Sequence, residues 1–246
     1  TAGRVYAVDP VGTLRWEFRL PFAVVSSVVV GAFGSLYFTE SEQHLYAVSA
    51  TAVPIWRKDI GDSVSAGPLV SDGGRIVVGT RSGELLSFGW SGQARKIPLS
   101  LALDRKLWQA EDGSLYGLAE QALIALDRSG NERWGFGPAR AAAVGSGNIA
   151  VIGLHSDVTW LDSEGVPFSR FGLKTELGPQ VAVVAGRAYL VASLHNEIWA
   201  VKPTGSVEAR LFIDSGPIGS VLGDPRFGRI LVVSGGSTLT GVSTLP

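Results

Sequence analysis

Cysteine is absent from this 246-residue chain, and so is methionine. Without cysteine the protein cannot form disulfides, thiolate nucleophiles or cysteine-based zinc sites. Lysine and arginine do not gather in blocks and the formal net charge is −1, so no basic surface for nucleic acid or anionic lipid is predicted. No apolar run approaches the roughly 18 residues that a membrane-spanning helix needs, and the sequence predicts no such helix.

Apolar residues and glycine are abundant instead. Hydrophobic residues make up 46% of the sequence and charged residues 17%, and there are 32 glycines. This composition is too apolar for a disordered protein and supplies a large core interrupted by many turns. A polypeptide of this length can fold as one all-β domain, which is the organisation we predict for residues 1–246.

Two sequence markers recur in phase about every 40 residues. One marker is a glycine followed by a small or basic residue and an apolar run, and the other is a short run of the type Val-Tyr-Ala-Val-Asp. Because the two are independent, they indicate a structural repeat. The glycines are Gly34, Gly74, Gly113, Gly147, Gly186 and Gly228. The runs begin at Val5, Leu45, Leu85, Leu123, Val158, Ile198 and Leu239.

Each repeat predicts four short antiparallel strands separated by Gly, Asp, Ser and Pro. No gap is long enough for the crossover helix of a parallel sheet. The segment 115–128 has a helix-forming composition, but its phase matches the strand, turn and strand expected at 36–50. We therefore predict two strands there as well.

These units predict an all-β fold, a β-propeller of four-stranded antiparallel blades. A linear stack of such units would expose sheet edges that radial closure hides. The strand phase favours six blades, with seven possible, and the N-terminal hairpin is expected to complete the last blade. The expected units span residues 4–43, 44–83, 84–120, 121–156, 157–195 and 196–237, with a partial repeat at 238–246.

The third and fourth strands resemble the pyrroloquinoline-quinone-type propeller repeats. That family's docking pattern places a small residue and a turn glycine before a tryptophan, so that the indole lies on an adjacent blade and its N–H finds a backbone acceptor. The resemblance assigns structural docking to Ala7, Gly12, Trp16, Trp56, Ala125, Gly130 and Trp134.

The same family contains quinone-dependent dehydrogenases and non-enzymatic members, such as the propeller lipoprotein of outer-membrane protein assembly. The enzymes carry a vicinal cysteine pair and a calcium held by Glu, Asn and Asp. This sequence has no cysteine, and its three asparagines all lie in or beside turns of the repeat. We therefore expect the non-enzymatic branch, with no cofactor, no bound metal, no catalytic residues and an extracytoplasmic location.

Other residue types that could carry chemistry are interpreted as structural. His44, His155 and His195 fall at turns of separate units and are expected to be solvated. Asp9, Asp127 and Asp162 share one repeat position, where capping of the turn backbone is a simpler role than calcium binding. No Gly-x-Ser-x-Gly elbow precedes a helix, so nucleophilic hydrolysis is not predicted.

Charged residues in loops are the remaining candidates for function. The loops between fourth and first strands should share one face with the turns between second and third strands, and loops on a rigid scaffold commonly carry binding sites. The first hypothesis is a monomeric scaffold that binds a protein or peptide there, anchored by apolar residues at 20–23 or 99–103. The alternative is a small-ligand sensor or propeller enzyme that uses the axial channel. The candidate surface residues are Asp62, Arg81, Arg105, Lys106, Trp108, Arg140, Lys174 and Asp214.

Overall fold

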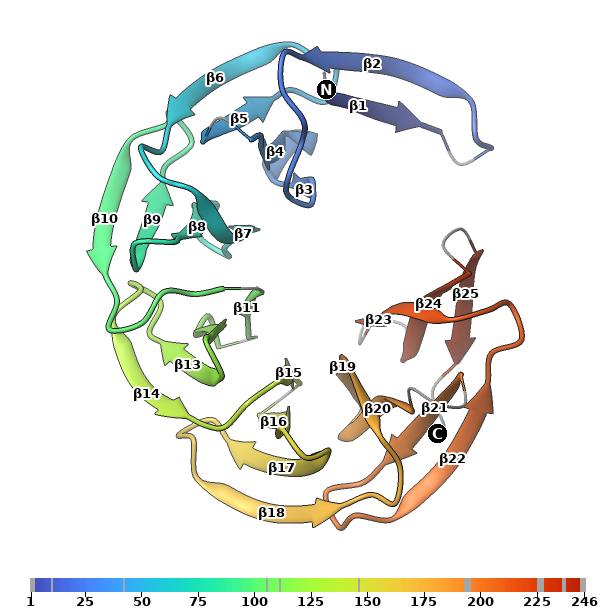
Figure 1. Cartoon of the computed structure of the whole chain (residues 1–246). Helices are drawn as coiled ribbons and strands as arrows, with labels where there is room; N and C mark the ends of the chain where they lie inside the picture. Colours follow the sequence, from blue (N-terminus) through green and yellow to red (C-terminus); the bar gives the residue numbers. More distant parts are fainter. Residues whose placement is uncertain are drawn as a thin grey trace. The chain divides into compact units, whose positions relative to one another are not determined.

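The computed structural model describes residues 3–9, 11–41, 43–104, 106–110, 112–145, 147–192, 196–224, 228–235 and 238–243. These residues form antiparallel strands almost throughout, with one short 3-10 helix, η1 (Ala32–Gly34). Within the described ranges there are seven sheets, of which five have four strands, one has three and one has two (Figure 1). The predicted β-propeller fold is confirmed, and the number of sheets fits seven blades rather than the six that the strand phase favoured.

In every sheet, strands that follow one another in sequence are neighbours in space. The first three sheets consist of β1 (Gly3–Val8) and β2 (Leu14–Leu20), of β3 (Val29–Val30), β4 (Leu36–Thr39), β5 (His44–Val48) and β6 (Pro54–Asp59), and of β7 (Val64–Val70), β8 (Ile76–Thr80), β9 (Glu84–Phe88) and β10 (Ala94–Pro98). The fourth and fifth consist of β11 (Leu107–Gln109), β12 (Leu115–Ala119), β13 (Ala122–Leu126) and β14 (Glu132–Phe136), and of β15 (Ala141–Val144), β16 (Asn148–Ile152), β17 (Asp157–Asp162) and β18 (Pro167–Gly172). The last two consist of β19 (Leu177–Val184), β20 (Arg187–Ala192), β21 (Glu197–Val201) and β22 (Val207–Phe212), and of β23 (Ile218–Asp224), β24 (Arg229–Ser234) and β25 (Thr238–Ser243).

The N-terminal hairpin forms a sheet of its own. Strand β1 pairs with β2, and β25 is the last strand of a three-stranded sheet. The expected pairing of this hairpin with the last sheet is therefore not among the hydrogen-bonded strand pairs of the described residues.

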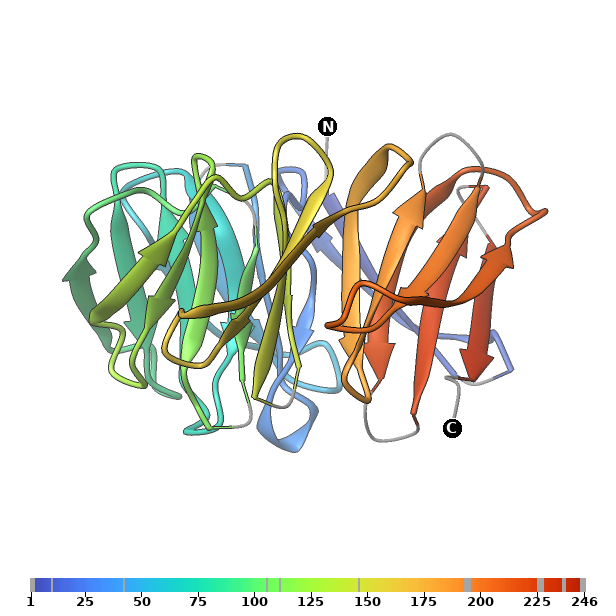
Figure 2. The same ribbon diagram turned by 90° about the horizontal axis from the view of Figure 1, so that it is seen from below.

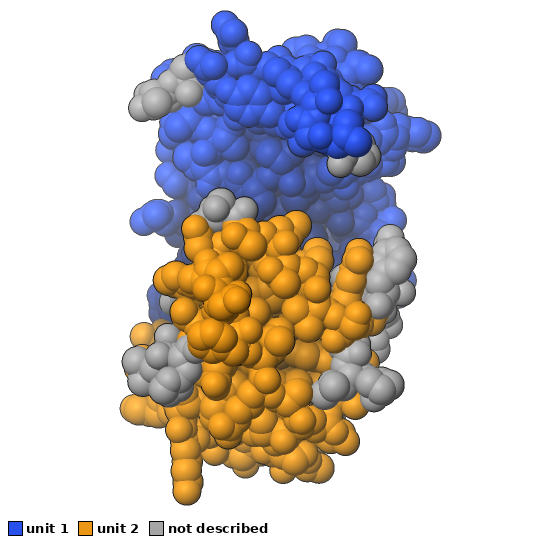
Figure 3. Space-filling view, turned by 90° about the vertical axis from the view of Figure 1, so that its right-hand side faces the viewer, with its two compact units in different colours: residues 1–109, 115–120, 126–132 blue, residues 110–114, 121–125, 133–246 orange. Residues whose placement is uncertain are grey.

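The protein consists of two compact units, which Figure 3 shows in different colours. Unit 1 comprises residues 1–109, 115–120 and 126–132, and unit 2 comprises residues 110–114, 121–125 and 133–246. Each unit has its own apolar clusters. One cluster in unit 1 surrounds Phe38 and Tyr46, and one in unit 2 contains both Trp160 and Trp199.

Burial explains why the second and third strands are so apolar. Every residue of β8 and β12 is buried, whereas exposure alternates along β6, β18 and β22. A strand covered on both faces favours continuous apolar sequence, and an outer strand with one free face favours alternation. Figure 2 shows the strands of each sheet running between two sets of connections.

The segment with helix-forming composition is also two strands, as the repeat predicts. Strands β12 and β13 are joined by a tight turn at Glu120, whose φ is 52°. Leu115, Leu123 and Leu126 are almost completely buried. Packing on both faces of the sheet outweighs the weak helical preference of these residues.

Tryptophan side chains link one sheet to the next within each unit. The indole Nε1 of Trp16 donates a hydrogen bond to the carbonyl of Ala50 at 2.9 Å, and that of Trp56 donates to Trp90 at 2.8 Å. In unit 2, Trp134 donates to Ser163 at 3.2 Å. Each acceptor lies in the turn between the third and fourth strands of the following sheet, so one side chain supplies both buried area and a directional bond.

The sheet β15–β18 makes this link with two residues instead of one. Trp16 and Trp56 lie opposite Ala7 and Ala47 on the neighbouring strand, whereas Trp160 lies opposite Ser169. Large and small residues have therefore exchanged strands.

In other sheets the tryptophan of the fourth strand supplies both buried volume and a hydrogen bond to the next sheet. In the sheet β15–β18 these two contributions come from different residues. Trp160 is completely buried in the cluster shared with the next sheet. Ser169 Oγ donates to the carbonyl of Pro203, which lies 34 residues further along the sequence, as in the bonds of Trp16 and Trp56. Trp160 supplies the volume and Ser169 the hydrogen bond.

Replacing Gly165 with alanine should disrupt the docking of Trp134. Gly165 has φ +79°, and a Cβ there would lie 2.5 Å from Cδ2 of the indole. We expect Gly165→Ala to lower the free energy of unfolding by about 2–4 kcal/mol, from the left-handed backbone and the clash together. The matched control is Gly186→Ala, with φ +71° and no atom within 4 Å of the Cβ, which should cost about 1 kcal/mol. Equal losses in urea denaturation of the two variants would contradict this explanation.

The exchange between Trp160 and Ser169 can be reversed by mutation. Trp160→Ala alone should cost about 3–5 kcal/mol because it leaves a cavity, and Ser169→Trp alone about 1–3 kcal/mol because it overfills the same space. In the double variant, which restores the alanine and tryptophan arrangement, the losses should be smaller than their sum. A double-mutant cycle by chemical denaturation measures this coupling, and strictly additive losses would show that the two sites do not share one space.

Candidate functional site

Loops and turns predicted to share a face are joined by backbone hydrogen bonds. In each case a residue beyond the fourth strand donates its N–H to a carbonyl in the turn between the second and third strands of the same sheet. We call these loops and turns the loop face of each unit. The bonds run from Ile60 to Gln43, from Leu99 to Gly83, from Ala139 to Gln121 and from Ile213 to Asn196.

On the loop face of unit 1, Asp62 is a capping residue. Its carboxylate accepts hydrogen bonds from the backbone N–H groups of Ser63 at 2.6 Å and Ser82 at 2.8 Å. Desolvation opposes ionisation, but the hydrogen bonds from Ser82 and Ser63 outweigh it and hold the pKa of Asp62 below its ordinary value. Arg81 is exposed beside it. Asp62 therefore ties the loop after β6 to the turn between β8 and β9.

The other candidate surface residues are dispersed. Lys106 is exposed and Trp108 is half-buried on β11, and Arg105 lies outside the described residues. In unit 2, the guanidinium of Arg140 donates to the carbonyl of Leu177. Asp214 and Lys174 are exposed, and of this set Lys174 lines a cavity.

Two of the proposed apolar anchors are wrong because their side chains are buried. Leu20 is 3% exposed and Leu103 is 0% exposed. Leu103 fills the space that Gly79 and Gly117 leave open, since a Cβ at either glycine would lie within about 3.2 Å of it. The apolar run predicted an exposed loop that could anchor a partner, but Leu103 belongs to the core.

Charged side chains on the outer two strands follow a repeated diagonal pattern. A cation on the fourth strand pairs with the first residue of the third strand, as in Lys96 with Glu84 at 3.0 Å and Arg170 with Asp157 at 2.9 Å. In the first sheet the signs are reversed. Arg4 lies on β1, which corresponds to the third strand of the other sheets, and Glu17 lies 3.2 Å away on β2, which corresponds to the fourth. The sequence analysis missed this pattern, although aligning the fourth strands would have found it.

In the sheet β3–β6 a histidine takes the place of the acid. Arg57 donates to Nε2 of His44 at 2.6 Å, and Nδ1 of His44 lies 2.5 Å from Oε1 of the buried Glu40. A proton on Nδ1 satisfies both contacts. The expectation that His44 is a solvated turn residue is wrong, because β5 begins at this residue and Glu40 lies beneath it. His155 is exposed as expected, and His195 lies outside the described residues.

The sheet β19–β22 departs from the pattern at Arg210. The carboxylate of Glu197, the expected partner, accepts a hydrogen bond from Nε1 of Trp199 at 2.7 Å. The guanidinium of Arg210 lies 4.1 Å from the centroid of the Trp199 ring, which is a cation–π contact. Trp199 is only 6% exposed, whereas Arg210 is exposed. The indole therefore holds an exposed cation in place.

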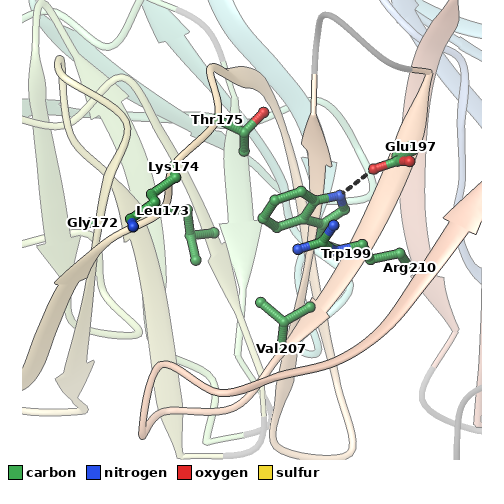
Figure 4. A pocket seen from close by; sticks show the side chains of 8 residues that line it. All are labelled: Gly172, Leu173, Lys174, Thr175, Glu197, Trp199, Val207 and Arg210. Carbon is green, nitrogen blue, oxygen red and sulfur yellow. Dashed lines mark hydrogen bonds between the residues drawn. The ribbon is translucent and has the colours of Figure 1, made fainter.

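A cavity of about 480 Å³ lies beside this pair in unit 2 (Figure 4). One wall comes from strands β21 and β22, and the other comes from the end of β18 and the loop that follows it. The hydroxyl oxygen of Thr175 is buried and has no hydrogen-bond partner among the described residues. The lining residues are Gly172, Leu173, Lys174, Thr175, Glu197, Trp199, Val207 and Arg210.

This arrangement suits recognition more than proton transfer. Lys174 and Arg210 supply positive charge at the surface, and Leu173, Val207 and the indole supply an apolar floor. Within the described ranges no three His, Asp or Glu side chains are placed to share a metal ion. A cavity of this composition and size can bind a group that is partly anionic and partly apolar.

The recurring aspartates cap turns, as predicted. Oδ1 of Asp9 accepts from the N–H groups of Val11 and Thr13, and Ser49 Oγ makes the corresponding bonds. Asp127 and Asp162 do the same in their own turns. Their oxygens are therefore used by the backbone.

Comparisons with known proteins agree with this architecture. A family model described as outer membrane protein assembly factor BamB matches residues 1–152. The crystal structure of BamB from Moraxella catarrhalis matches with a TM-score of 0.76 and 13% sequence identity, covering 97% of this chain and 76% of that one. A comparison with curated protein sequences found no significant match.

Two further solved structures have the same fold. BBS1N in complex with ARL6DN matches with a TM-score of 0.70 and 11% identity, covering 94% of this chain and 80% of that one. The streptogramin B lyase structure matches with a TM-score of 0.69 and 12% identity, covering 93% and 83%. At such identities the similarity shows the fold alone.

The turn at Asp127 should contribute to stability in a pH-dependent way. Burial opposes its ionisation, but hydrogen bonds from Asn131 and Ser129 outweigh this and lower the pKa of Asp127 in the folded state. A lowered folded pKa gives stability that is present above the ordinary value of 3.8 and lost as the pH falls through the folded value. Asp127→Asn should therefore be less stable than the wild type at neutral pH, and the difference should shrink below pH 3.8.

Thermal melts across this pH range measure the effect. Ser49→Ala is the matched control, because the hydroxyl caps the corresponding turn but does not titrate. Its deficit should not vary with pH. A pH-independent deficit for Asp127→Asn would contradict the assignment.

Proposed function

The protein belongs to the outer membrane protein assembly factor BamB family, and from this premise we propose that it is a non-catalytic scaffold that binds a protein or peptide partner through its loop face. The observation that carries the proposal is the family match over residues 1–152. We further propose that the partner is a component of outer membrane protein assembly and that the protein acts outside the cytoplasm. Within the described residues, no helix is both long and apolar enough to cross a bilayer.

The geometry of the loop face supports this function. Short connections are fixed by backbone hydrogen bonds and by caps such as Asp62, so the exposed side chains between them are presented on rigid supports. Arg81, Lys174 and Asp214 are exposed charges in these loops and turns. Preorganised loops lose little conformational entropy on binding. A partner would therefore meet charges that are held on rigid supports on the loop face of each unit.

The alternative, a propeller enzyme or small-ligand sensor, has weaker support. The streptogramin B lyase structure shares the fold at 12% identity, and a shared fold does not carry a reaction with it. The described residues contribute a polar and apolar cavity at Trp199. That cavity has the composition of a recognition site.

Site-specific photo-crosslinking tests the proposal. A photoreactive amino acid placed at Arg81, Lys174 or Asp214 should capture one component of the outer membrane assembly machinery in cells that produce the protein, identified by mass spectrometry. Thr51, Ser91 and Thr204 are exposed controls in turns between third and fourth strands, where capture should be absent. Capture from the control turns alone, or of no assembly component from any position, would refute the proposal.

A further inference from the structure

We infer that the cavity beside Trp199 binds a carboxylate carried on an apolar peptide segment. The inference rests on the proposed function and deepens it, since it assigns the chemistry of one anchor of the partner. The carboxylate can belong to an Asp or Glu side group or to the C-terminus of a polypeptide. The contacts of Arg210, Lys174 and Glu197 carry the argument.

Arg210 is the first element, because its charge is not neutralised in the way its counterparts are. At the corresponding position of other sheets, Lys96 and Arg170 pair with Glu84 and Asp157. Here the corresponding acid, Glu197, is bound to the indole N–H instead. Within the described ranges neither Arg210 nor Lys174 forms an ion pair. Two exposed cations therefore line one cavity, and neither forms an ion pair with Glu197, which lines it too.

The cation–π contact of Arg210 does not use its N–H donors. Cζ of the guanidinium lies over the Trp199 ring, 4.1 Å from its centroid, and the N–H donors lie in the guanidinium plane. Such a planar donor set matches the two oxygens of a carboxylate, and holding it in advance reduces the entropy lost on binding. Lys174 lies on the facing wall, where its side chain extends past Leu173 and away from the indole (Figure 4), and rotation of this exposed side chain would bring a second cation to a bound carboxylate.

Glu197 favours a peptide over a small multivalent anion. The Glu197 carboxylate lines the cavity and would repel a dianion such as phosphate more strongly than a singly charged carboxylate, and it can accept an amide N–H. A peptide bond supplies such an N–H.

The apolar wall specifies what lies next to the carboxylate. Leu173, Val207 and the Trp199 ring line the same cavity as the two cations. A volume of about 480 Å³ accommodates a few residues. Since Leu173 and Lys174 belong to the loop after β18, the cavity is continuous with the loop face through which the partner is proposed to bind.

Three blocked tripeptides test the inference on the full-length protein. N-acetyl-Leu-Glu-Leu-amide carries a side-group carboxylate, N-acetyl-Leu-Gln-Leu-amide is its neutral match, and N-acetyl-Leu-Gln-Leu with a free C-terminus carries the carboxylate at its end. The readout is the indole N–H resonance of Trp199 in a proton–nitrogen correlation spectrum, assigned with Trp199→Phe. At least one carboxylate peptide should shift this resonance and the neutral peptide should not. The arm that binds identifies the source of the carboxylate.

Two variants and one control locate the contact. Arg210→Gln and Lys174→Gln should each weaken binding about tenfold, the loss of one charge-assisted hydrogen bond. Lys96→Gln removes the cation from the corresponding strand position of another sheet and should leave binding unchanged. Circular dichroism shows whether each variant is folded.

Absence of any shift at millimolar peptide, equal binding of the neutral peptide, or unchanged binding by folded Arg210→Gln would overturn the inference. Its failure is distinguishable from that of the proposed function. If the wild type captures the assembly component and Arg210→Gln with Lys174→Gln captures it equally well, the cavity is not an anchor but the scaffold function stands. If the wild type captures nothing while the peptides bind as expected, the cavity assignment stands and the scaffold function fails.

Discussion

The fold depends on covering both faces of each sheet with its neighbours. The second and third strands are apolar on both faces, so a single sheet would leave a large hydrophobic area in water. The tryptophan of one sheet lies on a glycine or alanine turn of the next and donates to its backbone. This contact fixes the register of neighbouring sheets as well as their separation. Gly165 shows how closely the surfaces approach, because not even a methyl group fits between it and the indole.

Much of this fold could be predicted from the sequence, because the docking contact constrains residue types at fixed spacing. The glycine and the Val-Tyr-Ala-Val-Asp marker identified the repeat, the strand order and the segment 115–128. The number of sheets was harder to obtain, since the terminal strands match the repeat without stating which strands they pair with. Trp160 also escaped the pattern, because a pair exchanged across two strands preserves total volume while breaking the motif.

The candidate site was less predictable, for a physical reason. Loop charges were chosen because they lay in loops, but whether a charge is available depends on what lies beside it in space. Asp62 is occupied by backbone N–H groups and Arg140 by a carbonyl, whereas Lys174 lines a cavity with residues far away in sequence. The ring of Trp199 is buried, and its N–H binds Glu197, the carboxylate expected to pair with Arg210. The tryptophan at position 199 of this repeat thus leaves the charge of Arg210 exposed and without an ion pair, whereas the corresponding cations of other sheets are paired.

The spacing of the links between sheets has a mechanical consequence. The hydrogen bonds from Trp16, Trp56 and Ser169 each span 34 residues, so each closes a segment of similar length and similar construction. Tension along the polypeptide would be borne by these links in turn. Within a unit, a sheet could detach while its neighbours remain folded, and extension would proceed in steps of comparable length.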